Sequence, residues 1–154
     1  MKLNFPEYTF RIKEEEGKQL IFDEIRRNFV VLTPEERVRQ HVIRFLVKEK
    51  GFPASLLAIE KAICINQNNL RCDIVGYNRK GEPFLIVECK APEVNITQNA
   101  FNQIVRYNMK LKVAYLLVTN GLKHYCCKMD YDNMSYAFIE EIPSFSSIVR
   151  WLDF

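Results

Sequence analysis

The sequence predicts an α/β domain in which a mixed β-sheet is flanked by helices. Three observations predict this class: a capped amphipathic stretch from Thr33, a continuous apolar run from Phe84 to Cys89, and strand-like runs set between helical ones. With 154 residues, the chain has the size of one domain with a single core. We therefore expect one domain over 1–154, whose core spans 33–154.

Residues 1–32 are expected to form an N-terminal arm or hairpin. The stretch 8–32 alternates loosely around Glu14-Glu15-Glu16-Gly17-Lys18, so a short hairpin and an irregular arm both stay open. The start of the chain lacks the apolar stretch of a signal peptide, and no apolar run approaches the roughly 18 residues of a membrane span. These features predict a cytoplasmic protein without a membrane partner.

A first helix is predicted to begin at Thr33. Thr33 as N-cap, Pro34 at the first helical position and Glu36 three residues after the cap form a capping box. Apolar residues then recur at helical spacing: Val38, Val42, Phe45 and Leu46. Gly51 and Pro53 end the helix, because glycine favours a C-terminal cap and proline cannot continue a helix.

The remaining elements follow from runs of apolar residues between turn signals. Three strands are predicted over 57–65, 71–77 and 84–89, with a polar turn at 66–69 and a hairpin turn at 78–83. Beyond them we expect a helix over 97–110, strands over 113–118, 124–129 and 138–142, and a terminal helix over 144–152.

The five cysteines indicate neither a disulfide framework nor a zinc site. Their number is odd, and no Cys-x-x-Cys pair is present. His124 with Cys126 and Cys127 could form a metal corner, but buried, inert thiols are the better interpretation, since His41 is distant in sequence. The net charge of +3 permits contact with a polyanion without requiring it.

The predicted hairpin brings acidic residues together. If Lys80 and Gly81 are the two central turn residues, partner numbers sum to 161, and Asp73 lies opposite Glu88. Two carboxylates about 5 Å apart repel and raise each other's pKa, and a hard divalent cation such as Mg²⁺ would relieve that conflict. Lys90 shares the face of Glu88, because alternate strand residues point the same way. A loop of another length would shift this register.

Ordinary structural roles for these residues stay open. Asp73 could be a solvated strand residue, Lys90 a charged strand end, and either acid could form a structural ion pair with Lys90. Glu88 is hardest to explain this way, since it follows the apolar run 84–87 and a buried acid needs a partner.

The two strands resemble a known nuclease signature. Residues 71–75 followed by 86–92, Ile-Val-Glu-Cys-Lys-Ala-Pro, resemble the D-x(n)-E-x-K motif of PD-(D/E)xK nucleases. They are most similar to the N-terminal nuclease domain of type I restriction enzyme R subunits. Segments 21–26, 33–40 and 119–121 agree with small stand-alone versions of it. The resemblance implies a restriction-endonuclease-like core.

The resemblance also implies roles for particular residues. Asp73, Glu88 and the backbone carbonyl of Cys89 would hold Mg²⁺ or Mn²⁺, and Lys90 would assist catalysis. A Q-x-x-x-Y motif is matched by Gln103 and Tyr107, which share a helix face and could reach the site; a surface Gln and a core Tyr are the alternative.

An acidic residue of the first helix is also expected near the metal. Glu36 is the candidate, with Glu35 second and Glu60 weaker, although the capping box already explains Glu36.

Two departures from the family pattern matter. Cys72 stands where the superfamily has its naming proline. The ATP-driven motor of an R subunit is not expected either, because Glu82 and Pro83 stand where a P-loop spaced from Gly76 and Gly81 requires Lys and Ser or Thr.

The predicted function is therefore a Mg²⁺-dependent nuclease, expected to be an endonuclease acting on DNA. The alternatives are a catalytically silent nucleic-acid-binding or interaction module of a restriction or repair assembly, and a purely structural domain. Three further basic residues could contact phosphates or simply keep the surface charged: Arg106, Lys110 and Lys112. For partners beyond nucleic acid, a homodimer and an association with other restriction or repair subunits both stay open.

Overall fold

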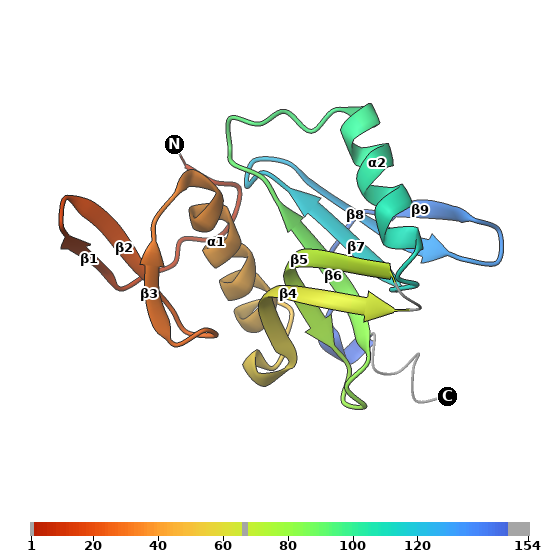
Figure 1. The fold of residues 1–154 in the computed structure, drawn as a ribbon, viewed down its shortest axis with the longest axis horizontal. Coiled ribbons are helices and arrows are strands. Elements are labelled where there is room, and N and C mark those ends of the chain that lie inside the picture. The colour runs from red at the N-terminus through yellow and green to blue at the C-terminus, as the bar shows by residue number, and fades with distance from the viewer. Residues whose placement is uncertain (1, 66–67, 148–154) are drawn as a thin grey trace.

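The structure, a computed structural model, describes residues 2–65 and 68–147. Two sheets flank one helix, as Figure 1 shows. The small antiparallel sheet contains, in this order, β1 (Ile12–Glu15), β2 (Lys18–Asp23) and β3 (Asn28–Val31). The large sheet contains, in this order, β4 (Leu57–Ile65), β5 (Asn68–Tyr77), β6 (Pro83–Cys89), β7 (Tyr115–Thr119), β8 (His124–Asp130) and β9 (Ser135–Ile139). The predicted class, a mixed sheet with helices, is confirmed.

The small sheet decides between the two predictions for the N-terminal arm. The β1–β2 hairpin turns at Glu16 and Gly17, both with positive φ (53° and 76°), as tight hairpin turns require. β3 then pairs with β2. The segment is thus a three-stranded meander rather than an irregular arm.

Helix α1 (Pro34–Lys48) begins and ends as the sequence predicts. The Thr33 hydroxyl accepts a hydrogen bond from the Glu36 N–H (3.0 Å), and Gly51 has a φ of +72° after the helix. The predicted capping box also requires the Thr33 N–H to donate to the Glu36 side chain, and this part of the prediction is wrong. The Thr33 N–H donates to the Val31 carbonyl instead. This leaves the Glu36 carboxylate available for other contacts.

The second long helix, α2 (Gln98–Met109), makes the sheet mixed. Among the described strands, β6 and β7 are parallel neighbours, and the others pair antiparallel. A parallel pair needs a crossover, which α2 supplies. A short 3-10 turn, Ala54–Leu56, precedes β4.

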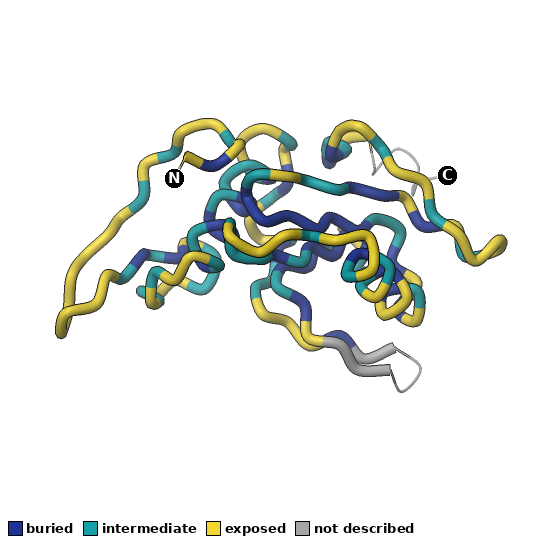
Figure 2. Tube along the Cα trace, turned by 90° about the horizontal axis from the view of Figure 1, so that it is seen from above, coloured by how far each residue is buried: buried dark blue, intermediate teal, exposed yellow. Residues whose placement is uncertain are grey.

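The central strand β6 is buried on both faces. Its Leu85 and Val87 pack in one hydrophobic cluster with α1, and Ile86 packs in a second cluster with Phe101 and Val105 of α2. Figure 2 shows the buried central strands between more exposed outer segments. The continuous apolar run predicted this sandwiched position correctly.

The loop between β5 and β6 differs from the predicted two-residue turn. The Asn78 N–H donates to the Glu82 carbonyl (2.9 Å), and the Gly81 N–H donates to the Asn78 carbonyl (3.0 Å). Three residues, 79–81, therefore form the loop, and Gly81 takes the positive φ (80°) that ends it.

A β-bulge restores the predicted register of β5 and β6. Tyr77 pairs with Pro83, one number short of the predicted sum, but the register shifts between Gly76 and Tyr77. The next three pairs all follow the predicted sum of 161. The last of these pairs, Ile74 with Val87, adjoins Asp73 and Glu88. The predicted two-residue turn is wrong, but the predicted register holds up to this pair.

Other boundaries move by a few residues. β5 begins before 71, β7 begins at Tyr115 rather than 113, and β9 lies three residues earlier than predicted. In the terminal helix predicted over 144–152, residues 145–147 are helical, and the rest lies outside the described residues, as do 66 and 67 of the predicted turn. Within the described ranges, no helix is long and apolar enough to cross a membrane.

Candidate active site

The alternation of side chains along β5 is interrupted at Asp73. In a regular strand, Cys72 and Ile74 would lie on the same face of the sheet. Instead, Ile74 packs in the hydrophobic cluster with α1, whereas Cys72 packs with Val75 in the cluster with α2 on the opposite face. The neighbouring strand is irregular at the same level, since Glu60 has a φ of 50° there. This twist frees Asp73 from a regular strand position and allows it to reach groups on both sides.

Both oxygens of Asp73 accept hydrogen bonds. The Arg39 Nη2 of α1 donates to Oδ1 (3.0 Å), and the backbone N–H of Cys89 donates to Oδ2 (2.7 Å). Arg39 is almost fully buried, with 6% of its side chain exposed. These two donors hold the Asp73 carboxylate in a fixed orientation.

Glu88 lies beside Asp73 without comparable support. Burial, the nearby Asp73 carboxylate and, more weakly, Glu35 together raise the pKa of Glu88 to about 7. Lys90 acts in the opposite direction, but Glu88 has no ion pair within 4.0 Å among the described residues. Glu88 therefore lacks an ion pair like the one that Asp73 forms with Arg39.

Cys89 and Lys90 alternate as predicted. The Cys89 side chain is buried in the α1 cluster with Val87, which leaves Glu88 and Lys90 directed toward the opposite side. Lys90 is half-buried and forms no ion pair with the described residues. Its ammonium is thus close enough to affect Glu88 but not committed to a structural partner.

A buried ion network lies on the α1 side of Asp73. Glu36 accepts hydrogen bonds from Arg26 (2.8 Å), Arg39 (2.7 Å) and Gln40 (3.2 Å). Arg26 and Gln40 also donate to the fully buried Asp23, which belongs to the small sheet. Arg39 therefore connects this network to the acid pair.

The contacts of this network test the prediction that an acid of the first helix, Glu36 or Glu35, lies near the metal. Glu36 contacts arginines and an amide rather than the Asp73–Glu88 pair. Glu35 is half-exposed and lies close enough to contribute to the raised pKa of Glu88. Glu60 forms ion pairs with three arginines: Arg26, Arg39 and Arg71. Glu35 is thus the acid of α1 whose charge acts on the pair, whereas Glu36 supports Arg39.

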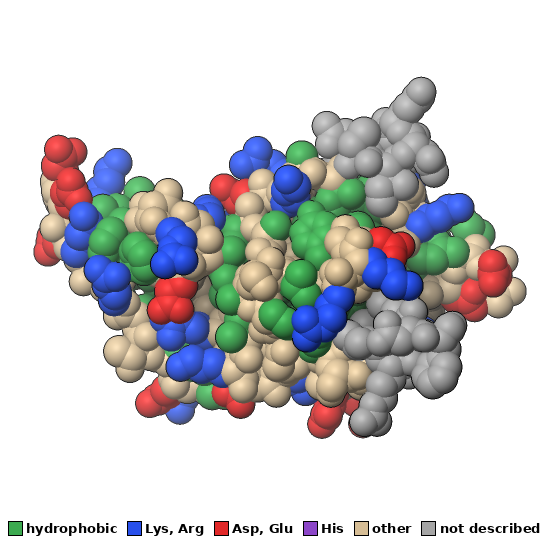
Figure 3. Space-filling view, turned by 90° about the horizontal axis from the view of Figure 1, so that it is seen from below, with side chains coloured by type: hydrophobic (Ala, Val, Ile, Leu, Met, Phe, Trp, Pro, Cys, Tyr) green, Lys and Arg blue, Asp and Glu red, His purple; other side chains and the backbone are tan. Residues whose placement is uncertain are grey.

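An open groove of about 540 Å³ lies beside this network. It is lined by residues of the small sheet, the start of α1, β4 and the loop after β6, among them Arg26, Glu35, Glu36, Arg39, Glu60 and Glu93. Figure 3 shows charged side chains of both signs gathered on the end of the molecule that carries the small sheet. With four acids against two arginines, the groove is negatively charged overall.

The residues of the predicted Q-x-x-x-Y motif lie on the outer side of α2. Phe101 and Val105 face the sheet, whereas Gln103 is exposed and Tyr107 is 58% exposed. Tyr107 contacts Lys110 through its ring (5.7 Å), and no contact with Asp73 or Glu88 exists among the described residues. Arg106, Lys110 and Lys112 are likewise exposed.

The described cysteines behave as buried thiols. Cys72, Cys89, Cys126 and Cys127 are buried, and burial raises the pKa of each thiol. His124 bonds Thr119 and the Asn4 carbonyl with its two nitrogens, so it forms no metal corner with its cysteine neighbours.

The donor set at the acid pair suits a hard divalent cation. Within residues 2–65 and 68–147, no three His, Cys, Asp or Glu side chains form a group that could hold a metal by themselves. The adjoining carboxylates of Asp73 and Glu88, of which Glu88 has no ion pair among the described residues, nevertheless supply the oxygen ligands that Mg²⁺ prefers. Solvent usually completes the shell of such an ion.

Sequence reasoning missed the residues that support the pair: Asp23, Arg26, Arg39 and Gln40. A signal existed, because Arg39 follows Glu36 by three residues on the same side of the helix as the apolar stripe. An arginine at such a position needs a buried acid as its partner.

Comparisons with known proteins agree with this fold. The family model for the type I restriction enzyme R protein N terminus (HSDR_N) matches residues 34–143. The fold is similar to a structure described as a fragment of an HsdR subunit of a type I restriction enzyme from Vibrio vulnificus YJ016, with a TM-score of 0.53 and 19% identity over 79% of this chain. The match covers 25% of that solved chain. No curated protein matches.

Proposed function

Since the chain belongs to the family of type I restriction enzyme R protein N-termini, we propose that it is a metal-dependent nuclease that hydrolyses phosphodiester bonds, preferentially of DNA. The observation that carries this proposal is the Asp73–Glu88 pair, two adjoining carboxylates of which one has its pKa raised to about 7. A partly buried acid that lies beside a second carboxylate and has no ion pair of its own costs stability, which is expected where a site is built for a ligand.

The proposed metal ligands are Asp73, Glu88 and the backbone carbonyl of Cys89. When bound there, Mg²⁺ or Mn²⁺ would lower the pKa of a coordinated water and neutralise charge on the phosphate. Asp73 is already oriented by Arg39 and the Cys89 N–H, so little rearrangement would be needed at that residue.

Lys90 is the proposed catalytic cation. Its ammonium has no structural ion pair among the described residues and lies on the same side as Glu88. It would hydrogen-bond the attacking water or a phosphate oxygen and stabilise the negative charge of the transition state. Gln103 and Tyr107, which lie on the outer side of α2, would contact the nucleic-acid backbone rather than the metal.

A second candidate is a binding module of a restriction or repair assembly without turnover. It is favoured by the absence, within the described residues, of a third side-chain ligand at the acid pair. Association with other subunits of such an assembly, or with a second copy of the chain, belongs to both proposals. The cytoplasmic location expected from the sequence stays a prediction.

Cleavage assays separate the two candidates. Linear, circular and single-stranded DNA would be incubated with Mg²⁺ or Mn²⁺ and wild type or Lys90→Ala, and Mn²⁺ binding would be measured by calorimetry. A nuclease cleaves only with the metal, and Lys90→Ala loses roughly 100-fold or more of the rate while still binding Mn²⁺. Asp73→Ala abolishes Mn²⁺ binding. Mn²⁺ or nucleic-acid binding without any cleavage would favour the binding module, and equal cleavage by wild type and Lys90→Ala would reject this site.

A further inference from the structure

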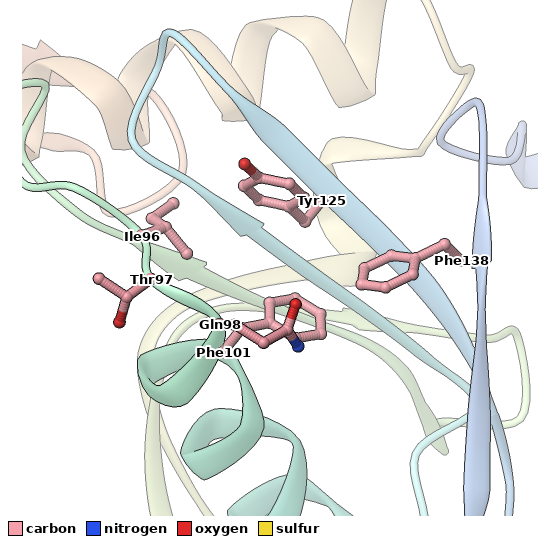
Figure 4. A pocket seen from close by; sticks show the side chains of 6 residues that line it. All are labelled: Ile96, Thr97, Gln98, Phe101, Tyr125 and Phe138. Atoms are coloured by element: carbon pink, nitrogen blue, oxygen red, sulfur yellow. The ribbon is translucent and has the colours of Figure 1, made fainter.

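A second hollow lies on the α2 side of the sheet. It measures about 190 Å³ and is lined by Ile96, Thr97, Gln98, Phe101, Tyr125 and Phe138. In Figure 4, Tyr125 and Phe138 extend from β8 and β9, and Phe101 and Gln98 from the first turn of α2. The volume is below the roughly 300–1,000 Å³ of sites for drug-sized ligands, so a single ring system suits it.

The aromatic rings of this pocket are held in place but incompletely covered. Phe101 lies 5.9 Å from Tyr125 and 5.1 Å from Phe138 between ring centroids. Phe138 is nevertheless 53% exposed. A half-exposed phenylalanine beside three other rings, those of Phe101, Tyr125 and Tyr136, offers an apolar surface to a planar ligand.

The sheet register puts this pocket on the same face as Glu88. Glu88 pairs with Val118 in β7, and Val118 pairs with Tyr125 in β8. Paired residues of neighbouring strands share a face, so Tyr125 is two strand spacings from Glu88, about 10 Å. That separation is comparable with the span between a phosphate at the acid pair and a base one or two nucleotides away.

Charge distinguishes this pocket from the groove on the opposite side of the acid pair. Four acids line the groove: Glu35, Glu36, Glu60 and Glu93. Among the described residues that line the pocket, none is acidic. A polyanion is repelled by the groove and not by the pocket. The polar atoms at the rim, in Thr97 and Gln98, are neutral and can bond the edge of a base.

We propose that this pocket binds one unpaired base of a nucleic-acid strand whose phosphate lies at Asp73 and Glu88. The inference rests on the proposed nuclease function and specifies its substrate: a single strand, or a duplex with a base displaced from its stack. The base stacks on Phe138 and Tyr125, and Thr97 and Gln98 contact its edge. Stacking on aromatic side chains tolerates any base, because every base has a π-face.

Binding assays with Phe138→Ala test the inference. The probes are a fluorescein-labelled single-stranded oligonucleotide and the same sequence as a duplex, measured by anisotropy with Ca²⁺ in place of Mg²⁺. Phe138→Ala is expected to weaken single-strand binding about 10-fold and duplex binding less than about twofold. Phe138→Trp keeps a stacking ring and should restore affinity. Met134→Ala, a change at an exposed residue outside the pocket, is the matched control.

The outcomes separate this inference from the proposed function. If wild type cleaves DNA but Phe138→Ala binds single strands as well as wild type, the pocket inference is rejected and the nuclease stands. If Phe138→Ala only turns a self-associating protein into a monomer with unchanged affinity, the rings form a contact between copies and the inference is again rejected. Phe138-dependent binding of single strands, without cleavage by wild type, rejects the nuclease and supports the base pocket.

Discussion

Asp23, which is fully buried, and Glu88, which is partly buried, are both carboxylic acids whose pKa burial acts to raise, and their surroundings differ in the donors that they meet. Asp23 accepts hydrogen bonds from the backbone N–H groups of Ile25 and Arg26 and from the side chains of Arg26 and Gln40. Burial acts to raise the pKa of Asp23, but these bonds outweigh it and hold the pKa below its usual value. Around Glu88, burial and Asp73 act together and raise the pKa to about 7.

The difference shows that burial by itself does not distinguish a structural acid from a functional one. The two kinds of acid differ in the number of hydrogen-bond donors around the carboxylate. On the α1 side, each carboxylate meets guanidinium or amide groups, so its charge stabilises the fold. Glu88 has no such partner among the described residues, so its ionised form destabilises the fold until a cation binds. Three substitutions test this contrast.

Arg39→Met is expected to have the largest effect, because Arg39 belongs to both regions. The change leaves Glu36 and Asp73 without their guanidinium, which should lower the free energy of unfolding by about 3–5 kcal/mol. Urea denaturation measures it. Arg71→Met is the matched control: its side chain is 71% exposed and pairs only weakly with Glu60, so a loss below about 1 kcal/mol is expected. If Arg39→Met and Arg71→Met lowered the free energy of unfolding equally, the buried network would contribute no more to stability than an exposed ion pair.

Glu88→Gln should stabilise the protein while removing metal binding. The folded-state pKa of about 7 lies above the ordinary value of 4.5, so the folded state holds the proton more tightly. The contribution of Glu88 to the free energy of unfolding is therefore fully present below pH 4.5. It is lost as the pH rises through about 7, by roughly 3 kcal/mol at most. The substitution should remove that slope.

Urea denaturation at about pH 5 and about pH 8 tests the sign of this linkage. Wild type should lose stability between the two values more than Glu88→Gln does. Mn²⁺ should raise the melting temperature of wild type at the higher pH and leave Glu88→Gln unchanged. A wild type that gains stability with pH relative to the variant would contradict the uncompensated pair.

Thr33→Ala should have the smallest effect, about 1 kcal/mol, because it removes the N-cap of α1 without changing any charge. Because α1 carries Glu35 and Arg39, this substitution tests whether destabilising the first turn of α1 changes the surroundings of the acid pair. We expect the pH slope of stability to match that of wild type. Thr33→Ser, which keeps the hydroxyl, serves as the control, and a changed slope in Thr33→Ala alone would link the cap to the acid pair.

Much of the fold could be predicted from local patterns. The cap and proline at Thr33 and Pro34 determined where α1 begins, and β4 was predicted to its residue bounds. The acid pair was also predictable, although through a two-residue turn that does not exist. The three-residue loop and the β-bulge offset each other, and neither leaves a clear signal in a single sequence.

The sequence by itself determined the order of the elements, the two-sided burial of β6 and the meeting of Asp73 with Glu88, because each depends on residues near one another along the chain. The tertiary structure alone decided that Arg39 holds Asp73 and that Glu36 belongs to the ion network. Those contacts join residues 34 positions apart and the small sheet to α1. Their geometry follows from how a twisted sheet packs on a helix, which no local spacing encodes.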